Sequence, residues 1–131
     1  MEKAEIMLNG RISEVLIGIG GRIELAGFVF AKDAIKYVIS NSKCGRIKEL
    51  YAAVASRRNV TVNSVDKGLA HFFNSINEKA REDEVNRVLG LPVYKKYDSL
   101  SNSQFIALIA ATLSKEYVYI DNKWINVKEL G

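Results

Sequence analysis

The strongest constraint on the fold is an apolar periodicity in residues 61–80. At about 100° per residue, Val65, Leu69, Phe72, Phe73 and Ile76 fall within about a third of a helix circumference. A helix with one apolar side must bury that side against other elements. The segment therefore predicts a long helix on the surface of a packed core, with its polar residues facing outward.

Five shorter helices are predicted around this segment. Apolar residues recur at helical spacing in residues 12–19, from position 28 or 31 to about 40, in 45–58, in 83–89 and after position 101. Gly20-Gly21 is expected to end the first helix, and Ser101 or Asn102 to cap the last. The fold class is therefore mainly α, a six-helix bundle over residues 1–114. The last helix is expected to bury Phe105, Leu108, Ile109, Thr112 and Leu113.

The C-terminal residues 115–131 follow a different pattern. Two β-branched and aromatic runs, 116–120 and 123–127, flank Asp121-Asn122, which predicts a β-hairpin. Because an isolated hairpin is marginally stable in water, we expect it to pack on the same domain or to pair with another chain. A wing that contacts DNA is less favoured, since the tail balances Lys115, Lys123 and Lys128 against Glu116, Asp121 and Glu129.

Composition places the chain among ordinary globular domains. Of its 131 residues, 48% are apolar and 26% are charged. The single cysteine, Cys44, cannot form an internal disulfide, and no Cys/His spacing suits zinc, so neither a metal nor a cofactor is predicted. The longest apolar run, 105–113, is too short to cross a membrane, and charged residues near the N-terminus do not resemble a secretory signal. These features favour a reducing cytoplasm.

The positive charge is localised. Residues 43–81 carry eight basic and three acidic residues, whereas the remainder carries eleven basic and twelve acidic residues. A local excess of this kind is what a phosphate-binding surface needs, although a solvated basic face would look the same.

The residues before the long helix have helix-turn-helix spacing. Ala55 is small enough for two helices to meet at a steep angle, and Asn59 tolerates the left-handed conformation of a tight turn. Thr61 can cap the second helix, and Val65 is placed to fill the space between the two helices. The layout predicts a helix-turn-helix whose second helix is 61–80.

The outer side of that helix carries residue types that read base edges. Lysine donates to guanine, asparagine pairs with adenine and aspartate accepts from cytosine. Phosphate contacts are expected from basic residues nearby and from the helix cap. The candidate base contacts are Asn63, Ser64, Asp66, Lys67, His71 and Asn74, and the candidate phosphate contacts are Lys43, Arg46, Arg57, Arg58 and Thr61. The alternative is an ordinary amphipathic helix pair whose polar face is merely solvated.

Six segments of the sequence, in the same order, resemble a known family. The segments are Gly27-Phe-Val-Phe-Ala-Lys-Asp-Ala-Ile35, Leu50-Tyr51 with Val54-Ala55, Asn59-Val-Thr61, Ser64-Val65, His71 and Asn102-Ser-Gln-Phe-Ile-Ala107. From about residue 12 to 113 the chain resembles the DNA-binding effector domain of the stage-zero sporulation protein A family. The resemblance implies a six-helix domain whose fourth helix enters the major groove and which binds double-stranded DNA as tandem dimers.

The chain also departs from the family pattern. Lys67 stands where the family uses a base-reading arginine, Asp66 where it has glutamate, and Ser64 and Ala70 replace arginines. Lysine lacks the planar fork that grips guanine, so the departures predict an altered and weaker sequence preference. We expect no receiver domain and hence no control by its phosphorylation, and the hairpin is a candidate for dimerisation in its place.

With the resemblance, the predicted function is that of a sequence-specific double-stranded DNA-binding protein, either a transcriptional regulator or a plasmid or phage accessory factor, in the bacterial cytoplasm at the nucleoid or a plasmid. Two other classes of function compete with this one. A protein-interaction module of the same fold could modulate a full-length relative through mixed dimers, as the replaced arginines suggest. An enzyme is disfavoured, because one histidine and no nucleophile elbow, phosphate loop or paired carboxylate motif leave little chemistry for a small-molecule substrate.

Overall fold

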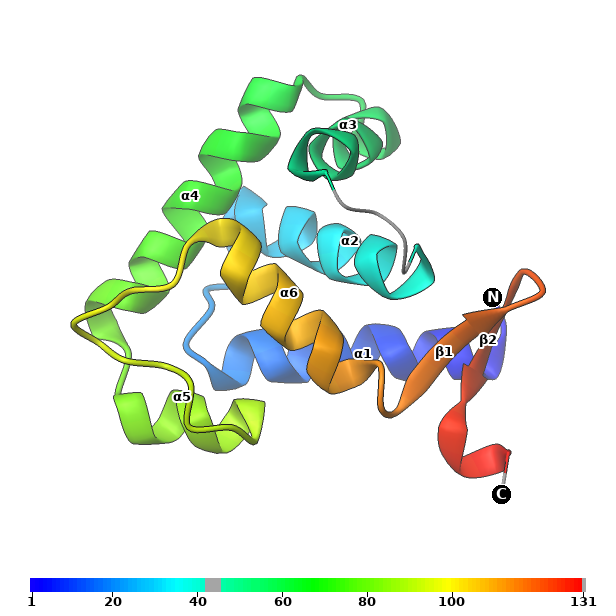
Figure 1. Ribbon diagram of the computed structural model, residues 1–131. Coiled ribbons are helices and arrows are strands. Elements are labelled where there is room, and N and C mark those ends of the chain that lie inside the picture. The colour runs from blue at the N-terminus through cyan, green and yellow to red at the C-terminus, as the bar shows by residue number, and fades with distance from the viewer. Residues whose placement is uncertain (42–45, 131) are drawn as a thin grey trace.

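The computed structural model describes residues 1–41 and 46–130 and confirms a mainly α fold with a C-terminal hairpin (Figure 1). The helices are α1 (Lys3–Gly18), α2 (Ala26–Ser40), α3 (Ile47–Arg58), α4 (Val62–Lys79), α5 (Glu82–Leu89) and α6 (Asn102–Leu113). The strands β1 (Tyr117–Ile120) and β2 (Lys123–Asn126) follow, with a 3₁₀ turn at Val127–Glu129. Among the described helices, none is long and apolar enough to cross a membrane.

The first helix is longer than the apolar spacing predicts. It begins at Lys3, although Leu8 is the only fully buried residue before Ile12, and the exposed Ile6 and Met7 blur the apolar stripe in this half. Its end agrees with the glycine signal, since Gly20 has a φ of 102° and the Gly21 N–H donates to the carbonyl of Leu16 at 2.8 Å.

Aromatic side chains build the core between α4 and α6. Phe72 and Phe73 of α4 are fully buried, and the Phe73 ring stacks on Phe105 of α6 with centroids 4.7 Å apart. Of the two predicted caps, Ser101 is the one that caps α6, in a capping box with Gln104. Leu108 and Thr112 are only half-buried, because they lie at the margin of the buried side; the Thr112 hydroxyl donates to the Leu108 carbonyl.

Two glycines, Gly27 of α2 and Gly68 of α4, allow these helices to pack closely. A Cβ added to Gly27 would lie 2.2 Å from the carbonyl oxygen of Gly68, and one added to Gly68 would lie 2.8 Å from the Phe30 ring. No larger side chain fits at Gly27 unless a backbone moves. The pair therefore fixes how closely α4 approaches α2, and with it the position of the outer side of α4.

The hairpin packs against α1 and α2 (Figure 1). Asp121 and Asn122 have φ values of 52° and 62°, which is the two-residue turn that the sequence predicts. Trp124 and Tyr117 are buried in the core cluster. The Arg11 guanidinium donates from Nε to Glu116 Oε1 at 2.9 Å and from Nη2 to Oε2 at 3.3 Å, which ties α1 to the start of the hairpin.

Candidate nucleic-acid interface

The turn between α3 and α4 has the geometry that the sequence predicts. Asn59 adopts a left-handed conformation with φ 55° and ψ 48°, and the Val60 N–H closes the end of α3 on the Ala55 carbonyl at 3.0 Å. Val65 is fully buried and Ala55 is nearly so, where the two helices meet. The chain thus contains a helix-turn-helix that leaves the N-terminus of α4 at the surface.

Thr61 and Ser64 form the cap of α4. The Thr61 hydroxyl accepts a hydrogen bond from the Ser64 N–H at 3.0 Å and donates to the Ser64 Oγ at 2.9 Å. The hydroxyl of Thr61, a predicted phosphate contact, is therefore engaged within the protein. Ser64 keeps its own hydroxyl hydrogen for an outside acceptor.

One side of α4 presents polar side chains that have no partner inside the protein. Asn63, Lys67, His71 and Asn74 are exposed, and within the described residues none of the four makes a hydrogen bond or ion pair. At about 1.5 Å of rise per residue they extend over about 16 Å, the length of roughly five base pairs. This row, which we call the α4 stripe, lies opposite the buried side of the helix.

Asp66 lies beside the α4 stripe and is also exposed. Burial raises the pKa of the Tyr51 phenol in α3, and the negative charge of the Asp66 carboxylate adds to this increase. Asp66 is thus placed near the junction of the two helices, on the edge of the surface that the stripe forms.

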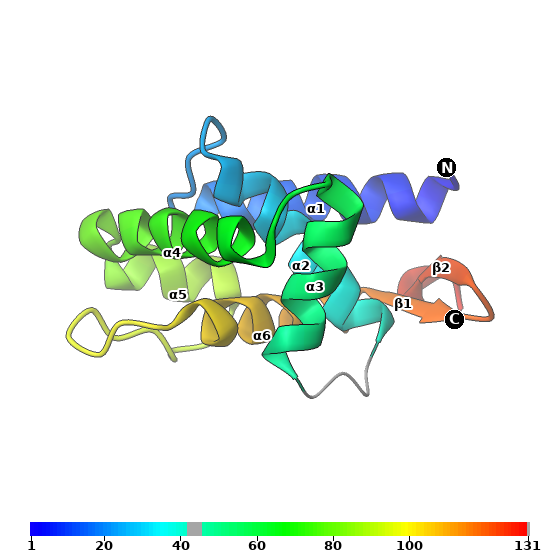
Figure 2. The ribbon, with the colours of Figure 1, turned by 90° about the horizontal axis from the view of Figure 1, so that it is seen from above.

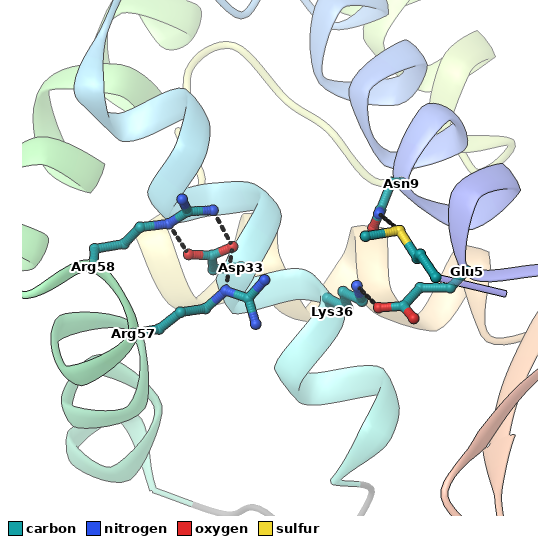
Figure 3. A network of polar contacts seen from close by, with 7 residues as sticks. Glu5, Asn9, Asp33, Lys36, Arg57 and Arg58 are labelled. Carbon is teal, nitrogen blue, oxygen red and sulfur yellow. Dashed lines mark hydrogen bonds and ion pairs between the residues drawn. The ribbon is translucent and has the colours of Figure 1, made fainter.

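Arg57 and Arg58, at the end of α3, converge on one carboxylate of α2 (Figure 3). Arg58 donates from Nε to Asp33 Oδ2 at 2.6 Å and from Nη2 to Asp33 Oδ1 at 2.9 Å. Arg57 Nε lies 3.6 Å from Asp33 Oδ1. Hydrogen bonding to Asp33 raises the pKa of the Arg58 guanidinium, even though partial burial opposes the increase. Sequence reasoning missed Asp33, because no local spacing links a residue of α2 to two residues 24 and 25 positions later.

The remaining phosphate candidates do not join this group. Arg46 is exposed at the residue before α3, so the whole of α3, about 18 Å long, separates it from Arg57 and Arg58 (Figure 2). Lys43 lies outside the described residues. The structure therefore brings together the two arginines and the α4 stripe, but not all of the predicted contacts.

A hollow of about 330 Å³ lies between α2, α3 and the hairpin, next to the arginines. Its lining includes Asp33, Lys36, Arg57, Tyr119 and Trp124. Lys36 forms an ion pair with Glu5 (Figure 3), and its Nζ lies 5.9 Å from the centroid of the Trp124 ring. The charged side chains that line the hollow thus have partners within the protein. In the described ranges, no group of three potential metal ligands occurs.

A family model described as the C-terminal part of sporulation initiation factor Spo0A matches residues 12–113. The match covers the second part of α1, from residue 12, and all of α2 to α6. The chain belongs to this family. The Spo0A C-terminal family consists of DNA-binding domains rather than enzymes, so the helix-turn-helix of this member stands in a DNA-binding fold. The hairpin and the first part of α1 lie outside the region that defines the Spo0A C-terminal family.

Proposed function

We propose that this protein binds double-stranded DNA sequence-specifically and regulates transcription, with α4 inserted into the major groove. The observation that carries the proposal is the α4 stripe. Four exposed polar side chains without internal partners lie on one side of the second helix of a helix-turn-helix. Base edges in the major groove supply the donors and acceptors that these side chains lack.

Each side chain of this surface has a role that its chemistry suits. Lys67 donates to guanine, Asn63 and Asn74 pair with adenine, and Asp66 accepts from cytosine. Ser64 and His71 contact bases at the margins. Because Lys67 is a point charge without the planar fork of arginine, the preferred sequence differs from that of relatives with arginine there, and discrimination is weaker.

Phosphates flanking the groove are bound by Arg57 and Arg58, and by Lys43 and Arg46 where the duplex extends along α3. Thr61 contributes by holding the helix N-terminus, whose peptide N–H groups attract phosphate. The protein acts as a homodimer on DNA, in the cytoplasm at the nucleoid or a plasmid, and residues 115–131 belong to the same domain.

Fluorescence anisotropy tests the proposal directly. The chain is titrated against a random duplex and a selected pool at about 50 to 300 mM salt, alongside Lys67→Ala and Arg57→Ala. We expect binding to weaken steeply with salt, Lys67→Ala to lose sequence preference, and Arg57→Ala to weaken all duplexes alike. If no duplex binds at the lowest salt, a module that forms mixed dimers with a related regulator replaces this proposal.

A further inference from the structure

Asp33 occupies the groups that a phosphate would use. A guanidinium has five N–H donors in a planar fork, and this fork matches carboxylates and phosphates equally well. Asp33 takes two donors of Arg58, at 2.6 and 2.9 Å, and attracts Arg57 from 3.6 Å. A single carboxylate thus engages both arginines at the end of α3 (Figure 3).

The two sides of this contact differ in exposure. The Asp33 side chain is 9% exposed, whereas those of Arg58 and Arg57 are 40% and 62% exposed. The carboxylate is thus enclosed by protein, and the arginines border the solvent from which a duplex would approach. Next to Arg57, the hollow of about 330 Å³ leaves space for its side chain to move.

We propose that Asp33 is an internal competitor of DNA phosphate for Arg57 and Arg58, and that it sets the affinity of the protein for any duplex. This inference rests on the proposed DNA-binding function. To bind phosphate through its Nε–Nη2 fork, Arg58 must give up Asp33, and to approach the duplex Arg57 must leave its ion pair with Asp33. Because phosphate contacts carry no sequence information, every duplex meets the same competition and the ranking of sequences is unaffected.

The test compares two substitutions that each remove one negative charge. Asp33→Asn preserves the size of the side chain, and its amide oxygen can still accept a hydrogen bond from Arg58, so the fold should survive. Asp121→Asn is the matched control, because Asp121 is exposed in the hairpin turn with φ 52°, a conformation that asparagine tolerates. Circular dichroism melting verifies that both variants are folded.

We expect Asp33→Asn to bind random and selected duplexes about three- to tenfold more tightly at low salt. The slope of log affinity against log salt concentration should steepen by the equivalent of about one to two additional phosphate contacts. Asp121→Asn should change binding by less than about twofold, since it alters only the net charge. In a chain that also carries Arg57→Gln and Arg58→Gln, Asp33→Asn should give no gain.

Three results would overturn the inference. One is an Asp33→Asn chain that binds like Asp121→Asn, and another is a gain that persists without the arginines. The third is weaker binding by Asp33→Asn, which would make Asp33 a support that presents the arginines. If the unaltered chain binds DNA, these results overturn the competition and leave the proposed function standing. If the unaltered chain binds no duplex, both fail together.

Discussion

The α4 stripe and the C-terminal hairpin both expose polar side chains, but they differ in how those side chains are arranged and partnered. In the hairpin, the Glu116 carboxylate is bound by Arg11, and the Asn126 side chain accepts from the Lys128 N–H at 3.0 Å. In the stripe, side chains such as Lys67 have no partner among the described residues. Hairpin side chains such as Lys123 also lack a partner among the described residues, so what sets the stripe apart is that its unpartnered groups form a row along one side of the second helix of a helix-turn-helix.

The boundary between the two surfaces coincides with the limits of the family match. The stripe lies within residues 12–113, whereas the hairpin and the first part of α1 lie outside them. Those two outer segments meet at Arg11 and Glu116, and Glu5 of α1 pairs with Lys36 beneath Trp124 of the hairpin. They thus form one addition to the DNA-binding domain, and we expect it to contribute to stability more than to DNA affinity.

The largest effect on stability and DNA binding should come from a substitution that displaces α4 from α2. Gly27→Ala places a Cβ 2.2 Å from the Gly68 carbonyl oxygen and 2.4 Å from the Cβ of Phe72, so a backbone must shift. We expect the free energy of unfolding to fall by about 2–3 kcal/mol, because an overpacked core forces side chains and backbone out of place. DNA binding should weaken as well, because the α4 stripe moves. Urea denaturation and anisotropy measure the two effects.

Gly10→Ala is the matched control for this substitution. Gly10 lies within α1, and an added Cβ would meet nothing within 4 Å. The substitution should therefore stabilise the protein by about 0.5–1 kcal/mol through helix propensity, without changing DNA binding. Equal losses in both variants would show that the contact between Gly27 and Gly68 does not position α4.

The next effect distinguishes the two surfaces by their lysines. Lys67→Ala should cost about 1–3 kcal/mol for the preferred duplex and much less for a random one, because a base contact is lost. Lys123→Ala, in the exposed part of the hairpin, should change either affinity by less than about twofold. Equal losses on both duplexes for Lys67→Ala would make Lys67 a phosphate contact instead.

Sequence reasoning succeeded where the signal lies within one element or one turn. The α4 stripe follows from helical periodicity, and Asn59 and Asp121-Asn122 follow from the few residues that tolerate positive φ. Residue type alone narrows the cap of α6 to Ser101 or Asn102. Sequence reasoning failed where the decisive contact joins distant segments. No spacing rule brings Asp33 to Arg58 or Glu116 to Arg11, and the first turns of α1 are helical although they bury little.

A smaller effect is expected from the tie between α1 and the hairpin. Glu116→Gln removes the charge that Arg11 binds through two hydrogen bonds. Both side chains are about a third exposed, so solvent screening limits the expected loss of stability to about 0.5–1 kcal/mol. DNA affinity should stay unchanged in the anisotropy assay. A loss of affinity would show that the hairpin takes part in binding.

The smallest effect concerns two buried tyrosines, one in each region. Burial raises the pKa of Tyr51 in α3 and of Tyr117 in the hairpin. The folded protein therefore holds these phenols neutral at a pH where the unfolded chain, with a tyrosine pKa of about 10, begins to ionise. The contribution of these two phenols to the free energy of unfolding is fully present below about pH 10 and is lost as the pH rises through their folded pKa values.

Phenylalanine substitutions assign that alkaline loss to each region. Tyr117→Phe and Tyr51→Phe should each flatten the fall in unfolding free energy between about pH 9 and pH 11, measured by urea denaturation. Tyr51→Phe also removes the acceptor of a long 3.5 Å hydrogen bond from Asn102, so it should cost slightly more stability at neutral pH. If only Tyr117→Phe flattened the curve, the alkaline loss of stability would belong to the hairpin phenol, and the helix-turn-helix would contribute none of it through Tyr51.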